Sequence, residues 1–190
     1  MTYQILITGC GTFIPSEVIN NETLVKAYNT HVEEYNREYS VEIAAGVRTA
    51  LKTSSADFIK NASGIEKRHV MEASGIIDPK RLRPNLGDRN PDELSYQAEM
   101  GLAAAKNALN QANKSVRDVG MLISACSNYE RPYPSLAIEV QKALGIDGFA
   151  FDMNVACSSV PFAIRLAYNS LLTQPELPGV LIVSPEFYTG

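Results

Sequence analysis

Strands and helices alternate along the second half of the sequence, and this alternation limits the folds that the chain can adopt. Apolar runs of strand length are separated by segments of helical periodicity, as in a parallel sheet with crossover helices. Parallel strands joined in this way form a sheet that is covered by helices on both faces. The pattern therefore predicts an α/β fold. The expected strands are 119–126, 149–154 and 180–183, and the expected helices between them are 135–144 and 158–172.

The beginning of the chain adds one more predicted strand. Residues 3–8 contain an apolar Ile-Leu-Ile core that ends at a Gly-Cys-Gly turn. We expect a mostly parallel, five-stranded sheet with helices on both faces, and the sequence assigns four of its strands to residues. Ligands of such sheets bind at the carboxyl ends of the strands, so we expect the functional site there.

The residues between about 27 and 90 interrupt this alternation. A helix should begin near Thr23, and residues 28–62 keep helical periodicity but are polar, as expected of a solvated helical excursion. Loop-rich sequence follows. We therefore expect one domain over residues 1–190, with a helical and loop insertion at about 27–90 within it.

A second long helix is predicted before the first strand of the alternation. Asn90 is a good N-cap residue, and the Pro91 that follows suits the first helical position. The helix should then run to about Ala112. Its expected buried stripe consists of Leu94, Ala98, Leu102, Ala105 and Leu109.

The composition argues against several classes of partner. The chain has 190 residues, 45% of them hydrophobic, so it can bury a core. Its net charge is −4, Trp is absent and no run of Lys or Arg forms a nucleic-acid footprint. No apolar stretch is long enough to span a bilayer, and the amino terminus carries no visible secretory signal. We therefore expect neither nucleic acid nor a membrane among the partners.

The cysteines and histidines do not form a metal-binding pattern. The three cysteines, Cys10, Cys126 and Cys157, are widely spaced and contain no CxxC pair. An odd number of separated cysteines argues against a disulfide framework or a zinc site and fits a cytoplasmic protein. The two histidines, His31 and His69, lie near no metal-ligand pattern, so no metal is expected.

Cys157 has the most reactive environment that the sequence predicts. It follows a predicted buried strand and precedes an apolar helix, so it should lie at the positive end of a helix dipole. That position favours the thiolate over the thiol, and exposed backbone N–H groups there can stabilise an oxyanion. An inert buried thiol is the alternative, because cysteine is among the most commonly buried residues. For Cys10 and Cys126, in or beside predicted core strands, we expect that alternative.

Two other motifs carry little functional information. Gly9-x-Gly11 follows a predicted strand, but a dinucleotide-binding fingerprint needs a third glycine where this chain has Ile14. We interpret these glycines as a turn that packs closely against its neighbours. The short basic run at 80–83 is suited to a phosphate or an acidic partner, but a solvated loop is the simpler interpretation.

Three segments together resemble the β-ketoacyl-[acyl-carrier-protein] synthase III family of the thiolase superfamily. Residues 63–69, Ser-Gly-Ile-Glu-Lys-Arg-His, are similar to the family's T-G-I-x-x-R-H turn. The Tyr-Pro-Ser at 133–135 is similar to its F-P-S element, and residues 151–159 resemble its nucleophile segment. The resemblance extends over essentially all 190 residues, and the helical excursion near 30–60 is similar to that of the family's longer subgroup.

The resemblance implies a two-step acyltransferase reaction of fatty acid biosynthesis that uses no cofactor. Cys157 would attack an acyl-CoA thioester, and the acyl-enzyme would condense with malonyl-acyl-carrier protein with loss of carbon dioxide. Tyr133 matches a residue that reaches across the interface of a homodimer to close the acyl pocket. Phe58 matches an aromatic residue that stacks on the CoA adenine, whereas the family's usual arginine four positions later is replaced by Ala62.

The family's catalytic His and Asn belong to its carboxyl-terminal half. No histidine follows Cys157 in this sequence. The resemblance therefore implies that the chain is the amino-terminal portion of the enzyme and needs the carboxyl-terminal half as a partner. Two alternatives remain open: a non-catalytic half-fold that serves as an interaction module, and another acyltransferase of the thiolase superfamily.

Overall fold

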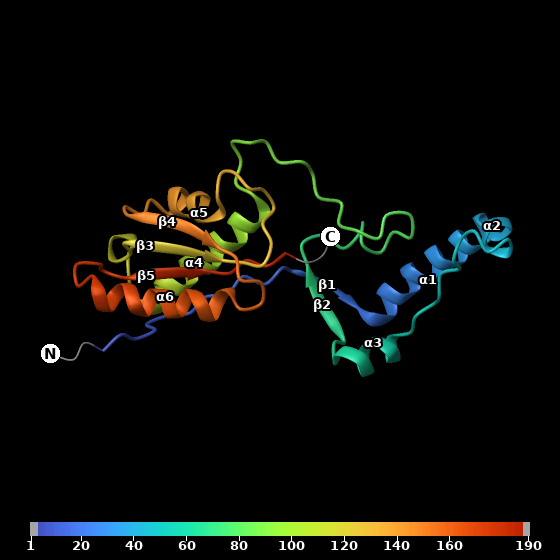
Figure 1. The fold of residues 1–190 in the computed structure, drawn as a ribbon, viewed down its shortest axis with the longest axis horizontal. Coiled ribbons are helices and arrows are strands. Elements are labelled where there is room, and N and C mark those ends of the chain that lie inside the picture. The colour runs from blue at the N-terminus through green and yellow to red at the C-terminus, as the bar shows by residue number, and fades with distance from the viewer. Residues whose placement is uncertain (1–3, 188–190) are drawn as a thin grey trace. The chain divides into compact units, whose positions relative to one another are not determined.

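The computed structural model describes residues 4–187, which divide into two compact units. Residues 4–13 and 89–187 form one unit, called the sheet unit below, and residues 14–88 form the other, called the small unit. Figure 1 labels the helices and strands of both units. None of the helices in the described part of the chain combines the length and the apolar character that a membrane span requires.

The sheet unit is built on three parallel strands. β3 (Met121–Ala125) lies in the centre and pairs with β4 (Phe149–Met153) on one side and with β5 (Val180–Val183) on the other. Each crossover between parallel strands carries a helix, as is usual for such connections. The strands and crossover helices predicted for this region are confirmed, and only their end residues differ.

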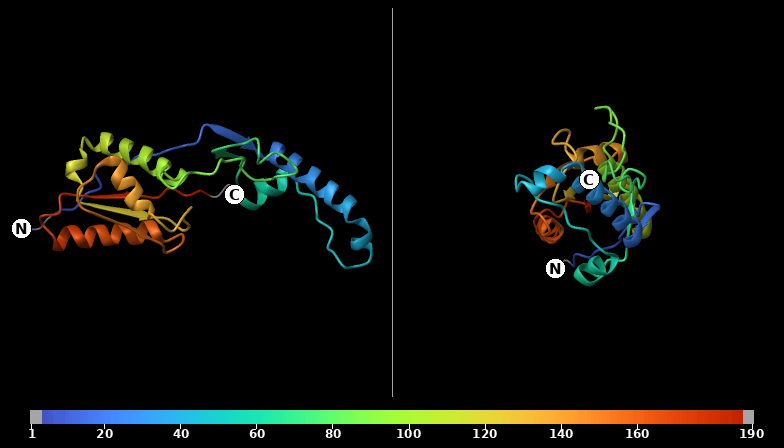
Figure 2. Two further views of the ribbon diagram at one scale, coloured as in Figure 1. Left: turned by 90° about the horizontal axis from the view of Figure 1, so that it is seen from above. Right: turned by 90° about the vertical axis from the view of Figure 1, so that its right-hand side faces the viewer.

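Helices cover both faces of this sheet. Figure 1 and the left view of Figure 2 show α4 and α5 on one face and α6 on the other. This arrangement confirms the predicted α/β class. The helices are α4 (Tyr96–Ala112), α5 (Leu136–Leu144) and α6 (Ser159–Thr173), and a short 3-10 helix, η1 (Val116–Asp118), leads from α4 toward β3.

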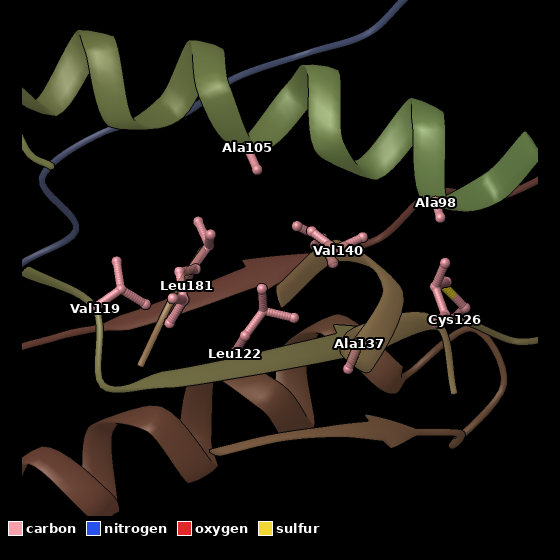
Figure 3. Close-up of a cluster of buried hydrophobic side chains, with 11 residues drawn as sticks. Ala98, Ala105, Val119, Leu122, Cys126, Ala137, Val140 and Leu181 are labelled. Carbon is pink, nitrogen blue, oxygen red and sulfur yellow. The ribbon is translucent and has the colours of Figure 1, made fainter. Parts of the chain in front are cut away.

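The alternation of side chains along β3 explains the two helical layers. All the residues of β3 are buried. Leu122 belongs to a cluster with residues of α4 and α5, whereas Met121 and Ile123 belong to a cluster with α6. Figure 3 shows the first cluster, in which Ala98 of α4 points toward the sheet. Because successive side chains of a strand point to opposite faces, one central strand supports both layers.

The strand predicted at residues 3–8 is absent from the described part of this segment. Tyr3 lies outside the described residues, and residues 4–8 form no strand. The side chains of Leu6 and Ile7 are 69% and 74% exposed. Within residues 4–187, the parallel sheet has three strands in place of the expected five. Residues 4–8 do not form one of them, because an apolar run becomes a strand only where it pairs with a neighbour.

Two glycines attach the same segment to α4 instead. A Cβ atom on Gly9 would lie 2.5 Å from the carbonyl oxygen of Ala108, and one on Gly11 would lie 2.1 Å from that of Ala104. Such distances exclude any side chain at these two positions. The predicted close packing of the glycines is therefore present, but against a helix.

The other two strands of the described chain lie in the small unit, where β1 (Glu17–Asn20) and β2 (Lys67–Val70) pair antiparallel. The sequence did not predict them, because both are short and largely polar. Ile19 and Val70 are buried and form a small core with Ile76. The polar helical excursion is present as α1 (Asn21–Glu38), α2 (Ser40–Ala44) and α3 (Ala56–Ser63).

The start of α4 differs from the prediction. Ser95 caps the helix, and its side chain accepts a hydrogen bond from an N–H of the first turn. Asn90, the predicted cap, instead closes a turn with Glu93. The reason lies in α5, where the carboxylate of Glu139 accepts hydrogen bonds from both the N–H and the hydroxyl of Ser95.

Glu139 is a buried acceptor that connects three segments. Its side chain is 4% exposed. Besides Ser95, it binds the guanidinium of Arg131, which also donates to the carbonyl of Glu93. A buried carboxylate is stable only when its oxygens are paired in this way. The contacts of Glu139 therefore join the start of α4, the loop after β3 and α5.

Replacement of Glu139 by alanine should lower the free energy of unfolding by about 3–5 kcal/mol, because the donors of Ser95 and Arg131 lose their buried acceptor. Glu99→Ala is the matched control. Glu99 pairs with Arg89 but is 45% exposed, so its loss should cost less than about 1 kcal/mol. Urea denaturation followed by circular dichroism measures both, and equal losses would contradict the role of Glu139.

Candidate active site

Cys157 lies in the turn that connects β4 to α6. β4 ends at Met153 and α6 begins at Ser159, so the cysteine stands beyond the carboxyl end of a parallel strand and at the amino end of a helix. Its side chain is exposed. The structure thus places this thiol in the strand-to-helix turn that the sequence predicts. Its role as a nucleophile stays a prediction.

The backbone of this turn is compact. The N–H groups of Ser158 and Ser159 donate to the carbonyls of Val155 and Ala156, each over 3.0 Å. Ala156 has a φ of 48°, in the left-handed region that residues with a Cβ atom rarely adopt. An unusual backbone conformation therefore immediately precedes Cys157.

Two side chains also hold the turn. Asn154 donates from Nδ2 to the Ser127 carbonyl over 2.9 Å, and its Oδ1 accepts from the N–H of Ala156 over 3.1 Å. The hydroxyl of Ser159 accepts from the N–H of Val155 over 2.9 Å. Neither role was predicted from the sequence, because no local pattern shows that Asn154 reaches Ser127 in the loop after β3.

Cys126 is a core thiol, as the sequence predicts. It is completely buried at the end of β3. Its sulfur lies 3.7 Å from the hydroxyl oxygen of Ser124 and 3.7 Å from the carbonyl oxygen of Pro185. Burial raises the pKa of the Cys126 thiol to about 12. At neutral pH the thiol is therefore protonated and a poor nucleophile.

Cys10 differs from its prediction. It was expected in or beside a core strand, but its side chain is exposed. Its backbone N–H donates to the side chain of Gln111 on α4 over 2.6 Å, since this segment lies against the helix and forms no strand. Among residues 4–187, the thiols of Cys10 and Cys157 are exposed. Of these two, only Cys157 lies between a strand and the start of a helix.

Tyr133 lies in the loop between β3 and α5, and its side chain is 87% exposed. Two contacts fix this region to the end of β4. Tyr129 donates to the carbonyl of Met153 over 2.9 Å, and Asp152 accepts from two N–H groups of the first turn of α5 over 2.8 and 3.0 Å. In the sequence, the charged Asp152 within an otherwise apolar strand is the one signal of its contact with α5. The predicted closure of an acyl pocket by Tyr133 stays a prediction.

Phe58 lies on α3 in the small unit, and its side chain is 66% exposed. It borders a hollow of about 790 Å³ whose walls include Tyr28, Ile59 and Leu82. Ala62 follows one helical turn later and supplies no cation. The stacking of Phe58 on the adenine of CoA stays a prediction.

Both histidines have partners within the small unit. Nδ1 of His31 lies 2.9 Å from the carbonyl oxygen of Pro79, and Nδ1 of His69 lies 2.8 Å from that of Pro15. Among residues 4–187, no three His, Cys, Asp or Glu side chains gather in a group that could hold a metal ion.

The sequence is similar to known condensing enzymes. Beta-ketodecanoyl-[acyl-carrier-protein] synthase of Pseudomonas aeruginosa is 46% identical over 166 residues, which cover 87% of this chain and 47% of that protein. Beta-ketoacyl-[acyl-carrier-protein] synthase III of Roseobacter denitrificans is 27% identical over 190 residues, which cover 100% of this chain and 45% of that protein. No protein-family model matches the chain. The chain spans about half the length of the curated relatives it matches.

Solved structures show the same fold. 3-oxoacyl-[acyl-carrier-protein] synthase III from Aquifex aeolicus matches 94% of this chain and 43% of its own, with a TM-score of 0.62 and 22% identity. A variant of OleA from Xanthomonas campestris matches 95% of this chain and 44% of its own, with a TM-score of 0.66 and 18% identity. The chain is thus a homologue of β-ketoacyl-[acyl-carrier-protein] synthase III proteins over about half of their length, as its motifs predict.

Iodoacetamide at about pH 7.5 should label Cys10 and Cys157 in the folded protein and leave Cys126 unlabelled. With a pKa of about 12, Cys126 is thiolate in fewer than about one molecule in ten thousand at that pH. Because the pKa is raised, its thiolate fraction grows only as the pH approaches about 12. Peptide mapping measures the labelling, with urea-unfolded protein as the control in which all three cysteines react. Equal labelling of Cys126 and Cys157 in the folded protein would contradict this prediction.

Proposed function

We propose that this chain is the amino-terminal portion of a 3-oxoacyl-[acyl-carrier-protein] synthase III-type condensing enzyme of fatty acid biosynthesis, with Cys157 as its acyl-accepting nucleophile. The observation that supports this most is the exposed Cys157 thiol between a parallel strand and the start of α6, in a homologue of such enzymes. We take residues 1–190 as one thiolase-like domain with an insertion at about 27–90. We place its reaction in the cytoplasm, since unpaired cysteines suit that compartment.

In the first step, the Cys157 thiolate attacks the carbonyl carbon of an acyl-CoA thioester. A carbon–sulfur bond forms, and the carbonyl electron pair moves to oxygen. The backbone N–H of Cys157 donates to this oxyanion, and the positive end of α6 stabilises its charge. The intermediate collapses as the CoA thiolate leaves with the electron pair of the broken bond. The products are an acyl thioester on Cys157 and free CoA, and no cofactor takes part.

In the second step, malonyl-acyl-carrier protein supplies the new carbon–carbon bond. Its carboxylate leaves as carbon dioxide, and the released electron pair forms a carbanion beside the thioester carbonyl. The carbanion attacks the acyl carbonyl, and the Cys157 thiolate leaves and is regenerated. The product is a 3-oxoacyl thioester on the carrier protein. The His and Asn that polarise the malonyl thioester come from the carboxyl-terminal half, which is therefore a required partner.

Two further residues bind the substrates in this proposal. Tyr133 closes the acyl pocket of the opposite subunit in a homodimer, and its 87% exposure leaves it available for such a contact. Phe58 stacks on the adenine of CoA beside the hollow of the small unit. Because Ala62 lacks a charge, the phosphates of CoA must be held by other cations.

The name of one relative points to an acyl chain length. A β-ketodecanoyl product has ten carbons, and each decarboxylative condensation adds two. The corresponding acyl group on the cysteine would have eight carbons. We therefore propose octanoyl-CoA as the first donor to test.

Octanoyl-CoA should leave an octanoyl adduct on Cys157 of the native protein, supplemented with the carboxyl-terminal half if loading requires it. Mass spectrometry of peptides measures the adduct, and its loss in hydroxylamine identifies a thioester. Cys10→Ala is the matched control with the other exposed thiol removed, and it should load normally, whereas Cys157→Ala should not load at all. An adduct on Cys10, or none on Cys157, would count against the nucleophile and favour a non-catalytic interaction module.

The products of a complete reaction test the second step. Release of carbon dioxide from malonyl-acyl-carrier protein together with a 3-oxoacyl thioester is the expected result. Condensation of two acyl thioesters without decarboxylation would instead identify another acyltransferase of the thiolase superfamily.

Phe58→Ala should raise the KM for octanoyl-CoA about 5- to 20-fold and leave kcat nearly unchanged. Stacking on a base is worth about 1–3 kcal/mol, and the adenine is remote from the reacting carbonyl, so the loss is one of uniform binding. Val41→Ala is the control, since Val41 is an 81% exposed apolar residue of α2 in the same unit. An unchanged KM in the Phe58 variant would remove this residue from the CoA site.

A further inference from the structure

The residue directly before Cys157 needs contacts that hold its backbone. Ala156 has a φ of 48°, where the Cβ of an L-residue crowds the backbone. Such a conformation persists only where the surrounding structure determines it. The helix that follows does not provide this restraint through its cap, because the N-cap residue Ser158 makes no side-chain capping hydrogen bond.

We propose that Asn154 and Ser159 are positioning residues that clamp Ala156 in its left-handed conformation and so fix the Cys157 thiol for acyl transfer. The inference rests on the proposed function of Cys157 as the acyl carrier. It gives a role to two side chains that the acyl-transfer steps do not otherwise use.

Asn154 holds the peptide group on the amino side of Ala156. Its Oδ1 accepts from the N–H of Ala156 over 3.1 Å. That N–H belongs to the peptide plane whose rotation is the φ angle of Ala156. The hydrogen bond therefore restrains the angle that is unusual.

Ser159 holds the peptide group on the carboxyl side. The carbonyl of Ala156 accepts from the N–H of Ser159 over 3.0 Å and lies 2.8 Å from its hydroxyl oxygen. The same hydroxyl accepts from the N–H of Val155 over 2.9 Å. Since φ and ψ are set by the two peptide planes that flank a residue, contacts to both planes restrain both backbone angles of Ala156.

Both clamping side chains are anchored to the end of the central strand. Asn154 donates to the carbonyl of Ser127 over 2.9 Å. The hydroxyl of Ser159 lies 3.2 Å from the carbonyl oxygen of Cys126, so that its single hydrogen is shared between this oxygen and the carbonyl oxygen of Ala156. Ser127 is itself fixed, because its N–H and hydroxyl donate to the carboxylate of Glu186 over 2.9 and 3.0 Å. The turn before Cys157 is thus attached to two adjacent carbonyls beyond β3.

This anchoring matters for an exposed nucleophile. A thiol on the surface has no packed neighbours to orient it, so its direction depends on the backbone that carries it. Acyl transfer requires the sulfur close to the carbonyl carbon and above the plane of the carbonyl group, and a misplacement of about 1 Å can lower a rate about 100-fold. Alkylation by a small reagent requires only an accessible thiolate.

The test measures octanoyl loading of Cys157 in the native protein, with alkylation of Cys157 relative to Cys10 as a second readout. Asn154→Ala should slow loading about 10- to 100-fold and change relative alkylation less than about threefold. Asn169→Ala is the matched control, an exposed asparagine on α6 outside the clamp, and should load at the native rate. Loading by the Asn154 variant at the native rate would overturn the proposal.

A glycine at position 156 separates a clamp from a general structural role. Glycine adopts positive φ without steric cost, so it needs less restraint there. In the Ala156→Gly background, Asn154→Ala should slow loading less than about threefold, which is a coupling that a double-mutant cycle detects. The same slowing with alanine and with glycine at position 156 would contradict the clamp.

Hydrogen exchange tests the clamp even if the native protein fails to load octanoyl-CoA, a result that would contradict only the proposed function. Asn154→Ala should speed exchange of the Ala156 amide, and Ser159→Ala should speed exchange of the Val155 amide, each at least about tenfold. Ser159 is buried, so its replacement can unfold the protein. The side chain of Asn154 is exposed, and its variant is therefore the one on which the test of the clamp depends. Native exchange rates at Ala156 in that variant would overturn the clamp.

Discussion

The pairing of β3 with a parallel strand on each side is the interaction on which the rest of the sheet unit depends. β3 is buried throughout and supplies alternate side chains to the helical layers on its two faces. Beyond its last residue, the carbonyls of Cys126 and Ser127 receive the side chains that hold the Cys157 turn. The candidate active site is therefore a continuation of the core strand, which gives an exposed thiol a rigid base.

Carboxylates determine where the neighbouring helices begin. Asp152 of β4 accepts from the first N–H groups of α5, and Glu139 of α5 accepts from Ser95, the cap of α4. A carboxylate at the amino end of a helix satisfies unpaired N–H groups and complements the helix dipole. No helix begins at Ser127, but Glu186 orders the loop after β3 by accepting from the N–H and the hydroxyl of this residue. Polar contacts thus order the edge of the sheet that carries Cys157.

Much of the fold follows from local patterns. Buried strands, the crossover helices and the glycine that ends α5 were predictable because hydrophobic period and turn chemistry act over a few residues. The failures share another cause. Residues 4–8 have the pattern of a strand but no partner, and Asn90 is a good cap that loses to Ser95 because Ser95 contacts a distant carboxylate. β1 and β2 have no apolar pattern and form only because they pair with each other.

The sequence by itself determined the parallel α/β alternation, the homology to condensing enzymes and the position of Cys157 in a strand-to-helix turn. Only the tertiary structure decided which thiols are accessible, since Cys126 is buried in the cluster between the sheet and the α4 and α5 layer, while Cys10 is exposed on a segment attached to α4. It alone also showed the contacts on both sides of Ala156. The physical reason is distance along the chain: periodicity reports on neighbours in sequence, whereas burial and hydrogen bonds between strands and loops exist only once the chain has packed.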